Sequence, residues 1–205
     1  MIHLDKAASG LWTVTIDRQD KANSLTGDML ERLAEIMEAA QDARAVILTG
    51  KGKVFSAGAD LDEARAGLAT SPLWERLSGA IAALPGLTIC AMNGTLAGGA
   101  NGMALACDLR IAVPSAKVFY PVMKLGYLPQ PSDPARLAAL VGPSRAKLIL
   151  MAGQKVTADD AYAFGLIDRI VQPEDLMSAA QELCTDVLAA KPEIAAGIKG
   201  MCAQD

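Results

Sequence analysis

The chain has 205 residues, of which 52% are hydrophobic, and this length and composition suit one globular domain with a substantial core. Its 19 basic and 23 acidic residues give a net charge of −4 without a basic run, which argues against a nucleic-acid partner. Asp5 and Lys6 interrupt the segment that a signal peptide would need, and no stretch reaches the roughly 18 apolar residues of a membrane span. We therefore expect a cytoplasmic protein.

The first 50 residues predict a unit of strand, helix and strand. Residues 11–17 alternate apolar and polar side chains, which is typical of a strand with one buried face. Apolar residues recur at helical spacing over 28–41, with Thr26 or Asp28 near the N-cap. Residues 45–50 are apolar throughout, as in a parallel strand covered on both faces. Such an arrangement is a βαβ unit.

Two later strand ends lead into unusually small residues. The strand-like run at 54–56 continues as Ala57-Gly58-Ala59-Asp60, and the strand predicted at 87–94 continues as LAGGANG, residues 96–102. Helices are predicted at 60–66 and 72–84, and a helix and two strands follow the second small-residue stretch up to residue 120.

The second half of the chain is predicted to be mostly helical. Helices are expected at 134–152, 157–163 and 174–190, with a short strand at 167–171, and Thr157 to Asp160 resemble a capping box. Since no low-complexity linker separates these segments, we predict one α/β domain with a helical C-terminal part.

The cysteines and the single histidine offer little chemistry. Cys90, Cys107, Cys184 and Cys202 lie far apart in apolar surroundings, so we interpret all four as core residues rather than metal or redox ligands. His3 lies at an N-terminus expected to be mobile or an edge strand, which excludes both Ser-His-Asp and histidine-metal chemistry.

The two small-residue turns each present backbone N–H groups at a helix N-terminus, where intrahelical acceptors are absent. If the turns are neighbours, these groups can converge on one oxygen atom as an oxyanion hole made of backbone. The alternative is that both are ordinary tight connections in which glycine supplies a positive φ. The second turn lacks the GxGxxG pattern and no Gly-Lys-Ser/Thr follows it, which argues against dinucleotide and P-loop sites.

Five ordered segments together resemble the crotonase superfamily, the enoyl-CoA hydratase/isomerase family. They are DKANSL (20–25), AVILTGKGKVFSAGADL (45–61), AMNGTLAGGANGMALACDLRIA (91–112), LGYLP (125–129) and AKLILMAGQKVTADDAYAFGLIDRIV (146–171). The resemblance covers nearly the whole chain and implies an α/β, crotonase-like spiral of repeated ββα units. It also implies a homotrimer or dimer of trimers and an acyl-CoA substrate from fatty acid metabolism. Coenzyme A would enter as part of this substrate, with no bound cofactor or metal.

The resemblance also implies site residues. The oxyanion hole resembles the N–H groups of Ala59 and Gly99, and a thioester oxygen would then be what approaches these small residues. Substrate-binding positions would be Lys21, Ala22, Ser24, Ala57, Asp60, Leu61, Gly98, Pro121, Val122 and Leu125. Lys21 would meet a coenzyme A phosphate as a point charge, or would be an ordinary solvated lysine.

The chain departs from the family at its acid and base. The two glutamates of the hydratases correspond to Gly102 and Val122, so we do not expect hydration by the two-glutamate mechanism. Asp133 is the best candidate for a catalytic base, and its alternative role is to cap the helix that Pro134 opens. Asp60 is likewise expected to cap the helix after the first turn, and Tyr120 either donates to a substrate or belongs to the core.

We expect a core domain at 1–190 and a short, truncated C-terminal helical segment at 191–205, where family members typically continue through helices that cover the acyl pocket. The sequence thus predicts an acyl-CoA lyase or isomerase of the enoyl-CoA hydratase/isomerase family, which stabilises a thioester enolate. The alternative is a non-catalytic protein that binds acyl-CoA or serves in assembly on the same scaffold.

Overall fold

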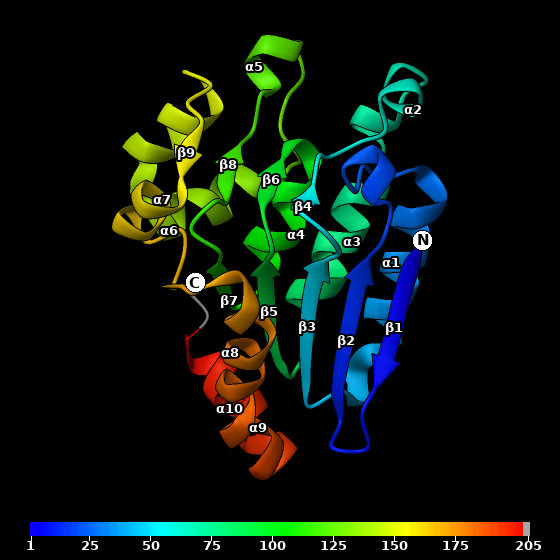
Figure 1. Ribbon diagram of the computed structural model, residues 1–205, viewed down its shortest axis with the longest axis vertical. Helices are drawn as coiled ribbons and strands as arrows, with labels where there is room; N and C mark the ends of the chain where they lie inside the picture. Colours follow the sequence, from blue (N-terminus) through cyan, green and yellow to red (C-terminus); the bar gives the residue numbers. More distant parts are fainter. Residues whose placement is uncertain (203–205) are drawn as a thin grey trace.

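A computed structural model describes residues 1–202 of the protein, and its strands form two sheets (Figure 1). The larger sheet has the order β1 (Ile2–Lys6), β2 (Leu11–Ile16), β3 (Ala45–Gly50), β5 (Leu87–Met92), β7 (Leu109–Ala112), β10 (Arg169–Ile170). The smaller sheet has the order β4 (Val54–Ser56), β6 (Thr95–Ala97), β8 (Lys117–Phe119), β9 (Val156–Thr157). Among the strand pairs within residues 1–202, β1–β2 and β8–β9 are antiparallel and the others are parallel.

Ten helices accompany these strands over residues 1–202. They are α1 (Gly27–Glu38), α2 (Leu61–Arg65), α3 (Leu73–Ala82), α4 (Asn101–Ala106), α5 (Val122–Leu125), α6 (Asp133–Leu150), α7 (Ala158–Phe164), α8 (Leu176–Leu183), α9 (Thr185–Ala189) and α10 (Pro192–Cys202). Three successive strand pairs follow one another along the chain: β3 and β4, β5 and β6, and β7 and β8. In each pair the first strand lies in the larger sheet and the second in the smaller sheet, and a helix follows. The predicted repetition of ββα units is therefore observed.

The predicted βαβ unit is confirmed. α1 connects β2 and β3, which pair in parallel from Leu11 opposite Ala45 to Ile16 opposite Gly50. The helix begins where predicted, because the Thr26 hydroxyl accepts a hydrogen bond from the Met29 N–H at 3.3 Å.

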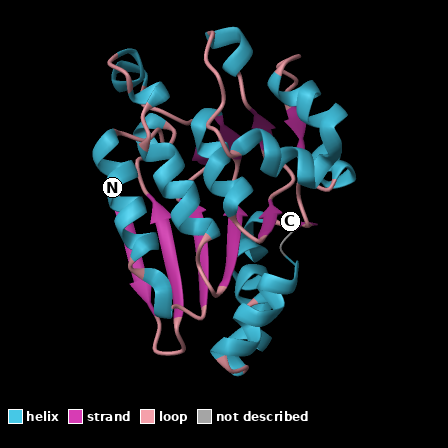
Figure 2. Cartoon of the chain, turned by 180° about the vertical axis from the view of Figure 1, so that it is seen from behind, coloured by secondary structure: helices cyan, strands magenta, loops and turns pink. Residues whose placement is uncertain are grey.

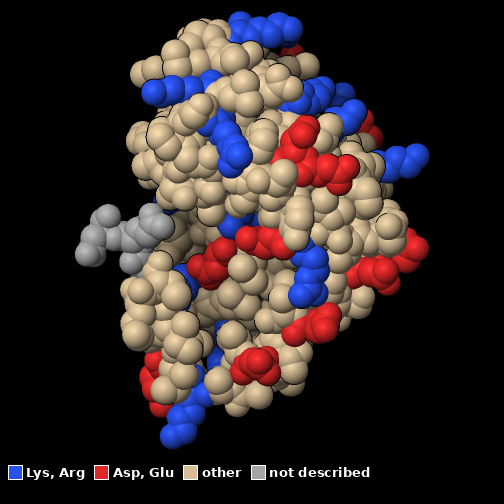
Figure 3. Space-filling model, turned by 90° about the vertical axis from the view of Figure 1, so that its left-hand side faces the viewer, with Lys and Arg blue, Asp and Glu red and all other residues tan. Residues whose placement is uncertain are grey.

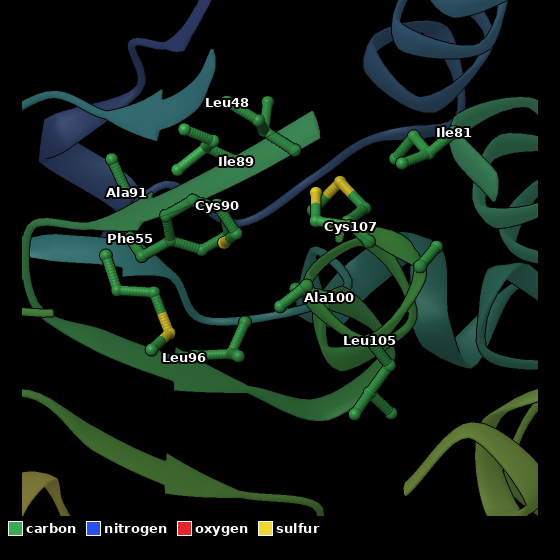
Figure 4. Close-up of a cluster of buried hydrophobic side chains, with 14 of the residues drawn as sticks. Leu48, Phe55, Ile81, Ile89, Cys90, Ala91, Leu96, Ala100, Leu105 and Cys107 are labelled. Atoms are coloured by element: carbon green, nitrogen blue, oxygen red, sulfur yellow. The ribbon is translucent and has the colours of Figure 1, made fainter. Parts of the chain in front are cut away.

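The core lies between the sheets and the helices that cover them. Figure 2 shows the helices that lie across one face of the strands, where α1 packs on α3 and α3 on α4. In the close-up of Figure 4, Leu48 and Ile89 from the larger sheet lie near Phe55 from the smaller one, in a cluster that also includes Leu105 of α4. All four side chains are buried. This packing fixes the carboxyl ends of β4 and β6, where the two small-residue turns begin.

The second half of the chain differs from the sequence prediction in three places. The helix expected at 174–190 is broken into a short 3-10 turn, α8 and α9. α6 is interrupted at Gly142 (φ 79°), because Pro143 lacks an N–H group and disfavours helical backbone at the residue before it. α5 was not predicted. The Thr157 cap is confirmed, since its hydroxyl accepts from the Asp160 N–H at 3.2 Å.

α10 has no buried residue and lies at the opposite end of the molecule from α2 and α5 (Figure 1). Lys199 anchors it, because its ammonium group lies 2.8 Å from the Asp108 carboxylate and 3.1 Å from the Gly86 carbonyl. The division into a core and a separate C-terminal segment at residue 190 stays a prediction.

None of the described helices is long and apolar enough to cross a membrane, and no cluster of three or more metal-ligating side chains occurs in residues 1–202. On the face shown in Figure 3, basic and acidic side chains are spread among large areas of uncharged surface.

Three of the four cysteines are core residues as predicted, but Cys202 is exposed, so its prediction was wrong. It lies on α10, which packs too loosely to bury any side chain. Burial raises the pKa of Cys107 to about 12 and also raises the pKa of Cys90 and Cys184.

We therefore expect iodoacetamide to alkylate only Cys202 in the native protein, and all four cysteines in 6 M guanidinium chloride. Peptide mass spectrometry of both samples measures this. Alkylation of Cys90 in the native protein at the rate of Cys202 would contradict the described core.

Candidate active site

The two small-residue turns lie in direct contact. β4 and β6 pair in parallel, with Ser56 opposite Leu96, so the chain leaves both strands at the same edge. Gly58 has a φ of +88°, and a Cβ atom on it would lie 2.9 Å from the Ala97 carbonyl oxygen and 3.3 Å from the Gly98 Cα. The contact requires glycine at position 58, for its backbone conformation and for its lack of a side chain.

Hydrogen bonds to Leu25 determine the direction of the Ala59 N–H. The Gly58 carbonyl accepts from the Leu25 N–H, and the Asp60 N–H donates to the Leu25 carbonyl, both at 2.8 Å. Because a trans peptide is planar, with its C=O and N–H on opposite sides, the Ala59 N–H points away from Leu25. Ala59 lines a cavity on that side.

Gly99 supplies the second donor position. Gly98 and Gly99 are the first residues of a 3-10 helix that continues into α4, and N–H groups at such positions have no intrahelical acceptor. Both glycines line the same cavity as Ala59. A Cβ on Gly99 would come within 3.0 Å of the Trp74 indole, so this ring packs closely on the turn. The two predicted donor positions thus line one cavity, as an oxyanion hole would require.

The cavity has a volume of about 320 Å³. It brings together most of the predicted site: Ala57, Ala59, Leu61, Gly98, Gly99, Pro121, Val122 and Leu125. Trp74, Tyr120, Tyr127 and Gln130 complete much of the wall. The lining is mainly apolar, which suits a thioester with an acyl chain.

Five predicted site residues do not line this cavity, namely Lys21, Ala22, Ser24, Asp60 and Asp133. Lys21 is exposed, and Ala22 lines a neighbouring cavity of about 370 Å³ together with Lys51 and Lys53. The walls of the two cavities are in contact, because the N–H of Ala57 in the first wall donates to the carbonyl of Ala22 in the second at 3.0 Å. Ser24 is buried.

Asp60 acts as the predicted cap of α2. Its Oδ1 accepts from the N–H groups of Asp62 (3.1 Å) and Glu63 (3.4 Å), while its Oδ2 pairs with Arg18 at 2.8 Å. Arg18 holds the pKa of this carboxyl below its usual range. A substrate contact of Asp60 therefore stays a prediction, whereas its capping role is confirmed.

The capping role predicted for Asp133 is wrong. Asp133 is the first residue of α6, and its side chain turns inward, where it is fully buried. Glu75 replaces it at the helix start, because its carboxylate accepts from the Ser132 N–H at 3.2 Å and from the Ser132 hydroxyl. The Asp133 carboxylate is thereby free for other contacts.

That carboxylate fills the space beside Gly102. A Cβ atom on Gly102 would lie 3.0 Å from Asp133 Oδ1, which has no hydrogen-bond partner among residues 1–202. Asp133 Oδ2 accepts from the Tyr120 hydroxyl at 2.9 Å. Gly102 follows Gly99 by three residues on one helical face, so Asp133 lies one turn from the proposed oxyanion donor.

Comparison with known proteins identifies the chain. The sequence model of the enoyl-CoA hydratase/isomerase family matches residues 6–204. The chain belongs to this family, within the crotonase superfamily.

Relatives of this enoyl-CoA hydratase/isomerase family member include enzymes of differing reaction. The short-chain-enoyl-CoA hydratase of Clostridium acetobutylicum is 34% identical over 192 residues, covering 87% of this chain and 72% of that protein. The 1,2-epoxyphenylacetyl-CoA isomerase of Escherichia coli is 31% identical over 208 residues, covering 96% and 78%. The crystal structure of the enoyl-CoA hydratase of Bacillus anthracis matches with a TM-score of 0.89 at 32% identity, covering 97% of this chain and 81% of that one. These likenesses confirm the predicted fold and a family that acts on acyl-CoA.

The environment of Asp133 suits a base that works near neutral pH. Burial raises its pKa to about 6, and Glu75 adds to the rise, whereas the hydrogen bond from Tyr120 and the nearby Arg136 oppose it. Burial and the charge of Asp133 raise the pKa of Tyr120, which therefore stays protonated and donates. A buried carboxyl group with a raised pKa of this kind is a common feature of functional sites.

The raised pKa of Asp133 makes the free energy of unfolding depend on pH. The folded-state pKa of about 6 exceeds the unfolded value near 3.9, so the folded protein is destabilised as the pH rises from 4 to 6. Above pH 6 the ionised Asp133 lowers the free energy of unfolding by about 3 kcal/mol, and below pH 4 this cost is absent. Asp133→Asn removes this cost. We expect the stability of the variant relative to the natural protein to rise by about 2 kcal/mol between pH 4.5 and 7.5. Urea unfolding at both pH values measures it, and a relative stability independent of pH would contradict the buried carboxylate.

Sequence reasoning missed two features of the site. It did not find Glu75, whose place beside Ser132 depends on the packing of α3 against the rest of the domain. It named Gly102 only as a missing glutamate, although the absence of a side chain there is what admits Asp133. The sequence signal for this arrangement was that Gly102 stands where a glutamate was expected, while an additional acid, Asp133, occurs in a later segment.

Proposed function

We propose that this protein transfers a proton at the carbon beside the thioester carbonyl of an acyl-CoA, as an enoyl-CoA isomerase, with Asp133 as the single base. The observation that carries the proposal is that the Asp133 carboxylate occupies the space beside Gly102, the position to which the sequence resemblance assigns a hydratase glutamate. A carboxylate from another element, the start of α6, would then take over the role of that glutamate.

The oxyanion hole would bind the carbonyl oxygen of the thioester. The N–H groups of Ala59 and Gly99 would donate to it, and their hydrogen bonds would strengthen as the enolate places negative charge on that oxygen. Such preorganised donors lower the barrier because they need no reorientation during the reaction.

Tyr120 would carry the proton to the base. It lines the cavity, and its hydroxyl already donates to Asp133 Oδ2. As the carbon–hydrogen bond breaks and its electron pair enters the enolate, Tyr120 accepts the proton and passes its own to Asp133. The neutral Asp133 then returns a proton by the same route to the γ-carbon, which shifts the double bond. Tyr120 stays neutral overall, which its raised pKa favours.

Isomerisation needs one proton-transferring group, whereas the two-glutamate hydration needs a second carboxylate to handle water. The second position is Val122, an apolar side chain in the cavity wall. The second carboxylate that hydration needs is therefore missing, whereas isomerisation needs only the carboxylate of Asp133.

The coenzyme A end of the substrate would lie toward Ala22. Lys21, Lys51 and Lys53 are all exposed there, and a cluster of lysines suits phosphate groups.

The test uses 3-hexenoyl-CoA, whose isomerisation creates a conjugated enoyl thioester that absorbs in the ultraviolet, alongside mass spectrometry of butyryl-CoA in D₂O. We expect isomerisation at roughly 1 to 1,000 per second and exchange of the α-protons. Calorimetry with butyryl-CoA accompanies both assays. Binding without exchange would overturn the proposal and favour the non-catalytic acyl-CoA protein, which the complete burial of Asp133 also fits.

A further inference from the structure

We propose that Arg18 is a positioning residue that holds the Ala59 N–H of the oxyanion hole in its direction. The inference rests on the proposed function of Ala59 as an oxyanion donor. Arg18 would act through Asp60 and Ser24, without touching the substrate.

One guanidinium nitrogen of Arg18 joins two segments of the site. Its Nη1 lies 2.8 Å from Asp60 Oδ2, and donates to the Ser24 carbonyl and the Ser24 hydroxyl, both at 3.2 Å. The Arg18 backbone is itself fixed, because its N–H donates to the Asn23 side chain at 2.8 Å. Arg18 thus connects the segment that precedes Leu25 with the residue that follows Ala59.

This connection reinforces a short junction of the site. Ala59 is held by an isolated bridge to Leu25 with two backbone hydrogen bonds, and one more backbone hydrogen bond, from the Ala57 N–H to the Ala22 carbonyl, joins the same two segments. The contacts of Arg18 lie one residue before Leu25 on one segment and one residue after Ala59 on the other. They therefore resist the sliding or opening of the bridge that would rotate the Gly58–Ala59 peptide.

Burial strengthens the arrangement. The Arg18 side chain is 24% exposed and that of Asp60 is 17% exposed, so solvent screens this pair less than an ordinary surface pair. Asp60 divides its two oxygens, with Oδ1 accepting from the first turn of α2 and Oδ2 accepting from Arg18. The rigid start of α2 is thereby tied to the same guanidinium.

The test compares Arg18→Met, Arg18→Lys and Asp60→Asn with the natural protein. Asp60→Asn retains an amide oxygen for the helix cap but loses the ionic contact, so it isolates the role of the pair. The matched control is Arg76→Met, which breaks the exposed ion pair of Arg76 with Glu38 (2.7 Å) on α1 and α3, away from the cavity.

Three measurements separate positioning from general destabilisation. The infrared carbonyl stretch of bound butyryl-CoA, labelled with ¹³C at the thioester carbonyl, reports the strength of the oxyanion hole directly. The turnover number reports its use, and the Kd of free coenzyme A, which has no acyl carbonyl, reports the rest of the binding site.

For Arg18→Met we expect a turnover number reduced about 10- to 100-fold, as for a misplaced group, and a smaller carbonyl shift. The Kd of free coenzyme A should change less than twofold. Asp60→Asn should show the same pattern, Arg18→Lys should recover part of the carbonyl shift, and Arg76→Met should match the natural protein.

An unchanged carbonyl shift in Arg18→Met would overturn the inference, as would a parallel loss of free coenzyme A binding, which would make Arg18 a substrate contact. If Arg18→Met does not fold, Asp60→Asn and Arg18→Lys decide the matter by the same criteria. A natural protein that shows no carbonyl shift refutes the oxyanion hole and the proposed function together. A natural shift that Arg18→Met leaves intact refutes the role of Arg18 alone.

Discussion

Asp133→Asn lowers the rate of α-proton exchange and of 3-hexenoyl-CoA isomerisation by about 10²- to 10⁴-fold, the usual contribution of a positioned base. The amide fills the same space beside Gly102 but has no basic oxygen. In the natural protein the rate rises with pH through about 6, because the ionised form of Asp133 accepts the proton and burial raises its pKa to that value. The variant retains only a slow rate that lacks this pH dependence.

Two further variants test the proton relay and provide a control. Tyr120→Phe removes the hydroxyl that donates to Asp133 and should also lose most of the exchange. Asp159→Asn, at an exposed position in the first turn of α7, is the matched control and should keep the natural rate. Exchange in Asp133→Asn within threefold of the natural rate would contradict the assignment of the base.

Gly58→Ala reduces both stability and turnover. The φ of +88° is unfavourable for alanine, and its Cβ would lie 2.9 Å from the Ala97 carbonyl oxygen, between the two turns. We expect the free energy of unfolding to fall by about 1–3 kcal/mol. We expect the turnover number to fall about 100-fold, because separation of the turns misaligns the Ala59 and Gly99 donors. Urea unfolding and the isomerisation assay measure the two effects.

Gly79→Ala is the control for this change. Gly79 lies inside α3, and a Cβ atom on it would meet nothing within 4 Å. Alanine in a helix interior is more favourable than glycine by about 0.5–1 kcal/mol, so this variant should be more stable and equally active. If Gly58→Ala behaves like Gly79→Ala, the two turns do not require the close contact described above.

The site was predictable to different degrees at different residues. The small size of Ala57, Gly58, Gly98 and Gly99 indicated a close approach to the backbone, because few other demands require so many small residues at a strand end. Asp60 was correctly read as a cap, since its Oδ1 interacts with residues two and three positions later. The inward orientation of Asp133 was not predicted, because it depends on Glu75, which lies 57 residues from Ser132 in the sequence.

The sequence by itself determined the alternation of strands and helices in the first 112 residues, the family and the positions of the two small-residue turns. These follow from local features, namely side-chain periodicity, residue size and the order of short motifs, which act over a few neighbouring residues. Only the tertiary structure decided which groups meet across elements. The pairing of β4 with β6 brings the turns together, and the packing of α4 against α6 places Asp133 beside Gly102. Contacts of this kind depend on how separate elements pack, and neither segment encodes them alone.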